Sequence, residues 1–235
     1  MKQLLVMSLL AAAGVSQAAD LFSNGAAVSG TPAISVIRTG GTLFGLGAQA
    51  TASNIVADNF TSGAAWNVQS LAFYSYQTGA ANAFTFTGVN WSVISGDVNT
   101  GTVVASGSGV PTNGGLLGYR VTSTTLTNTD RAIFQVNVDV PDFNLAAGSY
   151  WLRWSLTGSL ASGPWAPPTA SGAVGNAAQS TAGGAFALAV DAGDGLGVEL
   201  PFIIQGSVVP EPASLAMLLA GGLAVGAVVR RRRQA

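Results

Sequence analysis

The chain has 235 residues, of which 49% are hydrophobic and only 8% carry a charge. It contains no cysteine and no histidine, which excludes disulfides, Ser-His and Cys-His catalysis, and the ordinary zinc, copper and haem sites. Between its two ends, nine acidic residues stand against four arginines. This balance excludes the basic surface on which proteins bind nucleic acid.

The first 18 residues have the pattern of a secretory signal peptide. Lys2 is followed by a short apolar run and then by small residues at Ser16 and Ala18, the order of charged, apolar and cleavage regions in such signals. The apolar run is too short to cross about 30 Å of hydrocarbon as an anchor. We therefore expect cleavage after Ala18 and an exported protein.

Residues 19–207 are predicted to form one all-β domain, because several segments alternate apolar and polar side chains with a period of two. Gly-rich or Pro-containing breaks, such as 111–115, separate about ten strand candidates. The candidates are 33–38, 53–60, 66–77, 84–87 with 89–93, 101–106, 118–126, 134–140, 150–156, 186–190 and 197–205. The apolar phase changes at Gly88, which predicts a bulge or bend. This spacing favours an antiparallel, jelly-roll-like β-sandwich, with an open barrel as the alternative.

The segment from about 158 to 183 differs from the rest, because it is rich in Gly, Ala, Ser and Pro. A segment of this length without regular structure is unusual in a compact domain and is often functional. Too few residues follow it to build a second domain before the tail. We interpret it as a long surface loop tied down by Trp165.

The residues available for catalysis are carboxylates, and we predict no catalytic residue among them. Most lie beside Gly, Asn or Pro, where an acidic side chain usually bonds nearby backbone. They are Asp58, Asp97, Asp130, Asp139, Asp142, Asp191, Asp194 and Glu199. A glycosidase would need two of them facing each other, and sequence alone pairs none. We expect a non-enzymatic protein without a required cofactor.

Two binding hypotheses remain for the middle of the chain. Asp191 and Asp194 lie in a Gly-containing loop that predicts calcium ligands, with a simple turn as the alternative. Trp151 and Trp165 are candidates for stacking on sugar rings, with packing under a loop as the alternative. The second hypothesis would make the domain a carbohydrate-binding module.

The C-terminal residues 208–235 have three parts. Pro210, Glu211 and Pro212 precede an uncharged stretch predicted to be a transmembrane helix at about 212–229, and Arg230, Arg231, Arg232 and Arg233 follow it. Seventeen helical residues span about 26 Å, just enough for a thin bilayer. The arginines are expected to stay on the cytoplasmic side, and an ordinary single-pass anchor is the alternative.

This three-part tail resembles the PEP-CTERM family of sorting signals. The resemblance covers about the last 27 residues and implies recognition by exosortase, a membrane enzyme of exopolysaccharide-producing Gram-negative bacteria. It further implies an inner-membrane intermediate and then release to the cell surface or extracellular matrix. Exopolysaccharide is a candidate partner there. The resemblance assigns no ligand to the domain ahead of the tail.

Overall fold

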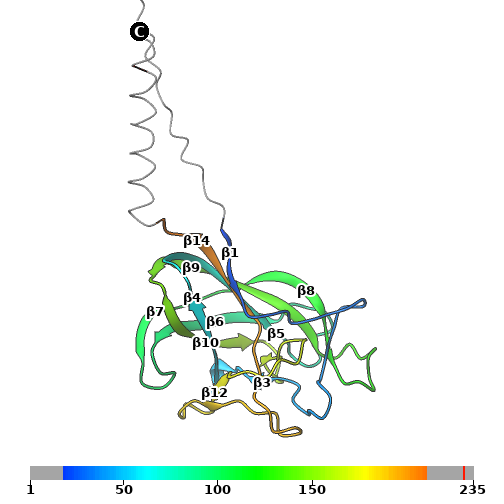
Figure 1. Ribbon diagram of the computed structural model, residues 1–235. Coiled ribbons are helices and arrows are strands. Elements are labelled where there is room, and N and C mark those ends of the chain that lie inside the picture. Colours follow the sequence, from blue (N-terminus) through cyan, green and yellow to red (C-terminus); the bar gives the residue numbers. More distant parts are fainter. Residues whose placement is uncertain (1–17, 211–229, 231–235) are drawn as a thin grey trace, which may run out of the picture.

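The computed structural model describes residues 18–210 and Arg230 and shows an all-β protein (Figure 1). Strands make up 52% of it and helix 2%, which confirms the predicted class. Most strands belong to two six-stranded sheets, an arrangement consistent with the predicted β-sandwich. The jelly-roll order of the strands stays a prediction.

Each sheet combines strands from distant parts of the chain. The first sheet contains, in spatial order, β1 (Ala19–Ser23), β14 (Phe202–Val208), β5 (Trp66–Ser75), β9 (Ala132–Leu145), β8 (Thr112–Val121) and β2 (Ile34–Val36). The second contains β13 (Ala187–Leu188), β12 (Ala178–Ser180), β4 (Ile55–Ser62), β10 (Gly148–Gly158), β6 (Phe86–Ser95) and β7 (Thr102–Gly109). A two-stranded ribbon joins β11 (Trp165–Ala166) to β3 (Leu46–Gly47), and a 3-10 turn, η1, covers Ala50–Ala52.

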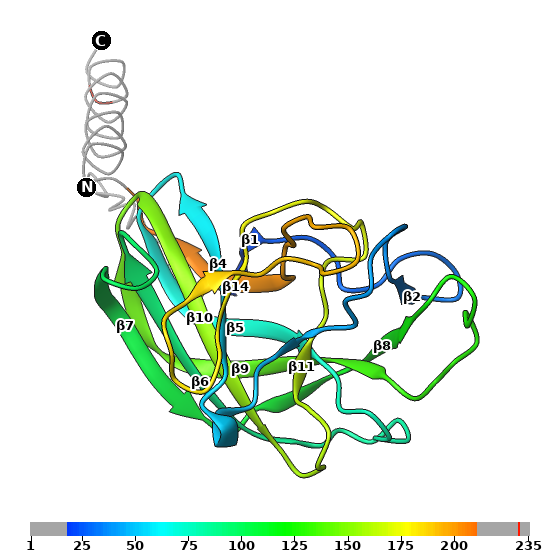
Figure 2. The ribbon, with the colours of Figure 1, turned by 90° about the horizontal axis from the view of Figure 1, so that it is seen from below.

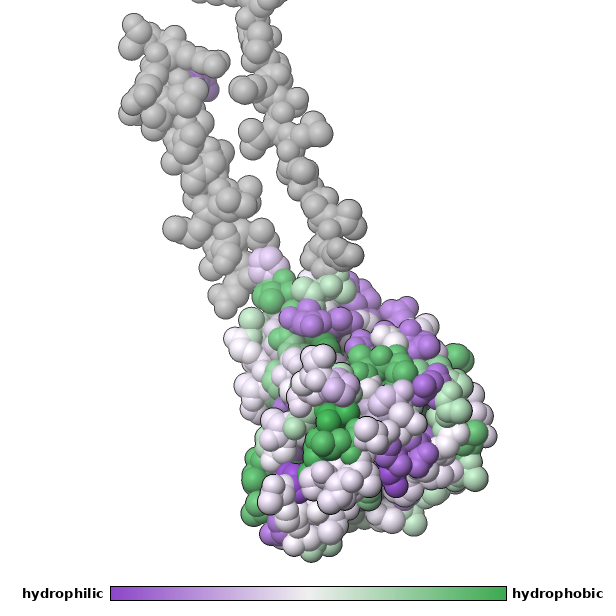
Figure 3. Space-filling view, turned by 90° about the vertical axis from the view of Figure 1, so that its right-hand side faces the viewer, coloured by the Kyte–Doolittle hydropathy of each residue, from purple (hydrophilic) through white to green (hydrophobic). Residues whose placement is uncertain are grey.

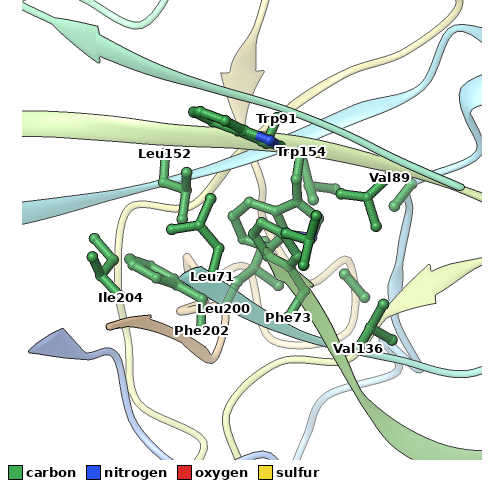
Figure 4. Close-up of a cluster of buried hydrophobic side chains, with 14 of the residues drawn as sticks. Leu71, Phe73, Val89, Trp91, Val136, Leu152, Trp154, Leu200, Phe202 and Ile204 are labelled. Carbon is green, nitrogen blue, oxygen red and sulfur yellow. The ribbon is translucent and has the colours of Figure 1, made fainter. Parts of the chain in front are cut away.

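The core lies between the two sheets and consists of the apolar faces that alternation predicts (Figure 4). On β10, Tyr150, Leu152, Trp154 and Leu156 are buried. The Trp154 ring stacks on Phe73 of β5, with centroids 5.0 Å apart. Aromatic pairs of this kind add about 0.5–1.5 kcal/mol to the burial of their area.

The two ends of the domain lie side by side. β1 and β14 pair antiparallel, with Ala19 opposite Gly206. β1 therefore starts directly after the predicted cleavage position, although the predicted signal peptide itself lies outside the described residues apart from Ala18. The predicted transmembrane helix at 212–229 also lies outside them. Within residues 18–210, no helix is long and apolar enough to cross a membrane.

Three details of the strands test the sequence reasoning. The bulge predicted at Gly88 is confirmed, because the pairing of β6 with β10 shifts register beside it. The break predicted at 111–115 is shorter than expected: residues 110 and 111 separate β7 from β8. β8 begins at Thr112 and accommodates the glycines through register shifts against β9, since a bulge admits turn residues within a strand. The expected antiparallel pairing has two exceptions: β2 pairs parallel to β8, and an isolated parallel bridge joins Gln49 to Leu156.

The segment 158–183 is less exposed than a surface loop. It contributes β11 and β12, and Pro164, Ala166, Pro167 and Thr169 are buried. The strand candidate 186–190 also differs from expectation. Its alternation predicts a buried apolar face that includes Leu188 and Val190, and this prediction is wrong. Leu188 and Val190 are 57% and 44% exposed, whereas Ala189 between them is 6% exposed. β13 is only two residues long, so its alternation is not imposed by a continuous sheet.

Candidate functional site

A groove with uncharged walls lies at the end of the domain opposite the start of β1 and the end of β14. Residues of β3, η1, β11 and β12 line it. Figure 1 shows β3 and β12 at this end, and Figure 2 views the domain from the same end. The groove has a volume of about 750 Å³ and no charged residue among its lining side chains. Trp165 is the one aromatic residue among those that line it, and we call it the Trp165 groove.

Trp165 is held in place from both sides of its backbone. It pairs with Gly47 of β3, and it exchanges two backbone hydrogen bonds with Tyr76, of 2.9 and 3.1 Å. Its indole Nε1 donates to Ser162 Oγ at 3.3 Å. The half-buried ring packs against the buried cluster that includes Tyr74, Tyr76 and Ile133. The ring is thus fixed before any ligand arrives, which lowers the entropy lost on binding.

Three side-chain amides line the groove, together with the hydroxyl-bearing Ser162 and Thr181. Asn54 Nδ2 donates to Gln49 Oε1 at 2.7 Å, and Gln179 Nε2 donates to the Gly47 carbonyl at 2.9 Å. A Cβ at Gly47 would lie within 3.3 Å of all three amides, so a glycine is needed there for them to converge. These contacts leave the Gln49 amide nitrogen as a donor and the Gln179 oxygen as an acceptor for a ligand.

Gly163 allows the Trp165 ring to take its position. Its φ is +92°, and a Cβ there would lie 2.6 Å from Trp165 Cδ1. Both the backbone angle and the close approach require a glycine. The alternation of strands gives no signal for this site, because Gln49 and Asn54 lie on either side of the short turn η1, and Gln179, in the three-residue β12, is far from them in sequence.

Trp151, the other tryptophan predicted to bind sugar, does not share this groove. It is half-buried on β10 and packs with Phe186 against the cluster of Ala57, Val98 and Ala178. Its position on the face of β10 opposite the buried Tyr150 and Trp154 agrees with the alternation. The structure therefore separates the two tryptophans, and only Trp165 lines the groove.

Asp191 and Asp194, the predicted calcium ligands, both have partners within the protein. Asp191 accepts backbone hydrogen bonds from Thr42, Gly193 and Leu43, of 2.8, 2.9 and 3.1 Å. Burial alone would raise the pKa of Asp191, but these N–H donors hold it below its usual value.

The Arg38 guanidinium makes a bidentate ion pair with Asp194, and its Nη2 lies 2.7 Å from Asp194 Oδ1. This pairing lowers the pKa of Asp194. No cluster of three or more acidic side chains that could hold a metal occurs among the described residues. The calcium hypothesis stays a prediction.

The structure brings together two carboxyl groups that sequence reasoning left unpaired. Asp58 lies on the core-facing side of β4 and is completely buried, whereas a turn position was expected for most acidic residues. Asn24 Nδ2 lies 3.1 Å from Asp58 Oδ2, 2.9 Å from Glu199 Oε2 and 3.0 Å from the Leu200 carbonyl. Neither carboxyl group lines the Trp165 groove.

Burial raises the pKa of Asp58 from 3.8 to about 8. The Leu200 and Asn59 N–H groups oppose the rise, and the adjacent Glu199 adds to it. The raised pKa favours the protonated form of Asp58 at neutral pH. Hydrogen bonds join Asp58 on β4 to Asn24, just after β1, and to Leu200 in the segment before β14.

The C-terminal end of the described domain leads into a segment that comparison with known proteins identifies. The family model described as the PEP-CTERM protein-sorting motif matches residues 208–233. The chain carries this sorting motif. No curated protein matches the chain.

The PEP-CTERM motif makes this an exported protein that is sorted by an exosortase-type enzyme. Sorting is associated with the membrane and leads to the surface. Pro210 is exposed at the end of the described domain. The other predicted sorting residues, Glu211, Pro212 and Arg231 to Arg233, lie outside the described residues, and Arg230 is described as exposed.

Proposed function

We propose that this is a non-enzymatic protein of the cell surface or extracellular matrix, whose β domain binds polysaccharide in the Trp165 groove. The observation that carries the proposal is the composition of that groove. A fixed tryptophan lies beside three amides and no charged side chain. A sugar ring offers apolar C–H surface for an indole and hydroxyl groups for amides, and sites for neutral ligands combine such groups.

The low charge of the chain also supports a location within hydrated polysaccharide. Only 8% of the chain is charged, and the face in Figure 3 is largely covered by pale residues of intermediate hydropathy. In the proposed route the tail first holds the chain in the inner membrane as a helix over about 212–229, and an exosortase-type enzyme then processes it.

A binding role is favoured over a catalytic one by the place of the carboxyl groups. The walls of the Trp165 groove contain none. The one close pair, Asp58 and Glu199, is held in hydrogen bonds to Asn24 and to backbone within the domain. A glycosidase requires both carboxyl groups to reach a bound sugar.

The test is binding of the full chain to exopolysaccharide purified from the cells that produce the protein. The protein is kept in a detergent without a sugar headgroup, because a glucoside would compete for the groove. We expect Trp165→Ala and Gln179→Ala each to weaken binding by about tenfold or more, as removal of a central contact does. Trp151→Ala is the matched control and should bind like the unaltered protein.

Folding of each variant is checked by near-ultraviolet circular dichroism. Absence of binding by the unaltered chain would refute the proposed function. Equal losses in the Trp151 and Trp165 variants, with both folded, would remove the Trp165 groove as its location.

A further inference from the structure

Trp165 separates the groove from a second, smaller pocket of about 210 Å³. Gly45, Ser162 and Trp165 line both cavities. The smaller pocket adds Phe44 and Arg131, along with Tyr76 and Thr78. A chain-like ligand that lies across the tryptophan therefore reaches an uncharged wall on one side and a guanidinium on the other.

Arg131 is oriented by the ring next to it. Its Cζ lies 3.9 Å from the centroid of Phe44, a distance at which a cation and an aromatic face attract each other. Stacking uses the face of the guanidinium and leaves its in-plane N–H groups for an acceptor. The carboxylate of the neighbouring residue, Asp130, accepts a hydrogen bond of 2.9 Å from Asn128 Nδ2.

The other three arginines of residues 18–210 each have interaction partners within the domain. Arg38 is paired with Asp194. Arg120 is buried and donates to Ser35 Oγ and to backbone carbonyls. Arg153 lies over Phe186 and donates to the Val98 carbonyl. Within the described residues the single ion pair is the one at Arg38, so the guanidinium of Arg131 has no carboxylate partner there.

We propose that the ligand of the Trp165 groove is an acidic polysaccharide, with an uncharged sugar against Trp165 and the amides and an anionic sugar at Arg131. This inference rests on the proposed function and narrows its ligand class. The acidic excess of the domain gives no general attraction for a polyanion. Recognition of the anionic group therefore depends on this one residue and its fixed geometry, through a charge-assisted, bidentate contact.

The test compares glycan pairs that share a backbone and differ only at C6, where one member is neutral and the other a uronate. Mannan with mannuronan and a cellulose oligomer with glucuronan, all β-1,4-linked, form two such pairs. A sulfated cellulose oligomer, compared with glucuronan, distinguishes sulfate from carboxylate as the anionic group. The full chain is assayed in a detergent without sugar, by isothermal titration.

We expect the unaltered protein to bind the acidic member of one pair about three- to tenfold more tightly than the neutral member. Arg131→Gln should abolish this preference and leave affinity for the neutral member unchanged. Arg131→Lys should keep only part of it, because lysine lacks the planar fork. Gln179→Ala should weaken both members equally, and it provides a second variant if Trp165→Ala does not fold.

Different results would overturn polysaccharide binding and the acidic class of the ligand. If neither these glycans nor the exopolysaccharide of the producing cells binds, the proposed function falls. If both members of every pair bind equally, or if Arg131→Gln keeps the preference, only the acidic class is overturned. Equally tight binding of polyglutamate would also overturn it, because charge alone would then explain the contact.

Discussion

Protonation of Asp58 predicts that the domain loses stability as the pH rises. The folded-state pKa of Asp58 is about 8 and the ordinary value is 3.8, so the folded protein holds a proton that the unfolded chain releases. Its stabilising effect is fully present below about pH 4 and is lost as the pH rises through about 8. At 1.36 kcal/mol per unit, the loss is on the order of 5 kcal/mol over this window.

The perturbation that isolates this effect is Asp58→Asn, which resembles the protonated acid and does not titrate. Its oxygen can still accept from the Leu200 N–H, a bond of 2.7 Å in the unaltered protein. Between pH 5 and pH 8 we expect the free energy of unfolding to fall by about 3–4 kcal/mol in the unaltered chain. The Asp58→Asn chain should lack this fall and be the more stable of the two at pH 9.

The assay is denaturant unfolding of the full chain, followed by tryptophan fluorescence at pH 5, 6, 7, 8 and 9. Asp139→Asn is the matched control, because Asp139 is exposed on β9, and its curve should run parallel to that of the unaltered protein. If the unaltered and Asp58→Asn chains have the same pH dependence, the buried proton is not present and the reasoning is wrong.

Three further predictions concern the groove, the core and the tail. Gly163→Ala should lower stability by about 1–3 kcal/mol and weaken glycan binding, because the added Cβ meets Trp165; Gly79→Ala, also at positive φ but with open space around it, should cost less and leave binding intact. Phe73→Ala should reduce the free energy of unfolding by about 3–5 kcal/mol in equilibrium melts, since Phe73 is fully buried against Trp154. Glu211→Ala, or deletion of 230–233, should leave an unprocessed precursor on immunoblots of cell fractions, and normal processing in both variants would contradict the sorting role of these residues.

The sequence pattern was informative wherever a strand is long and one face is buried. Trp154 and Leu152 alternate with polar residues on β10, and both are buried as the alternation requires. The change of phase at Gly88 likewise follows from local side-chain order. Short elements carry too few residues for any period to show, which is why β3, β11 and the exposed Leu188 of β13 were not anticipated.

The contacts that build the candidate sites are set by topology rather than by local pattern. Asp58 and Glu199 are far apart in the sequence and meet only because β4 and the segment before β14 pack together. Gln49 and Gln179 are also far apart in the sequence, and tertiary packing brings both to Gly47. Trp165 was singled out from its residue type, but the second pocket with Arg131 depends on the pairing of β11 with β3. The PEP-CTERM tail, in contrast, is a linear motif and was readable directly.

The pairing of β1 with β14 also determines how the domain would carry mechanical load. Val208 ends β14 at one pole, and the Trp165 groove lies at the other (Figure 1). A pull between the tail and a ligand in the groove acts along the length of β14, which is bonded to β1 on one side and β5 on the other. Hydrogen bonds loaded in shear must break together, whereas those at a peeled edge break one after another. The rate of forced unfolding should therefore be low in this direction, and the domain would act as a stiff link between what holds the tail and what fills the groove.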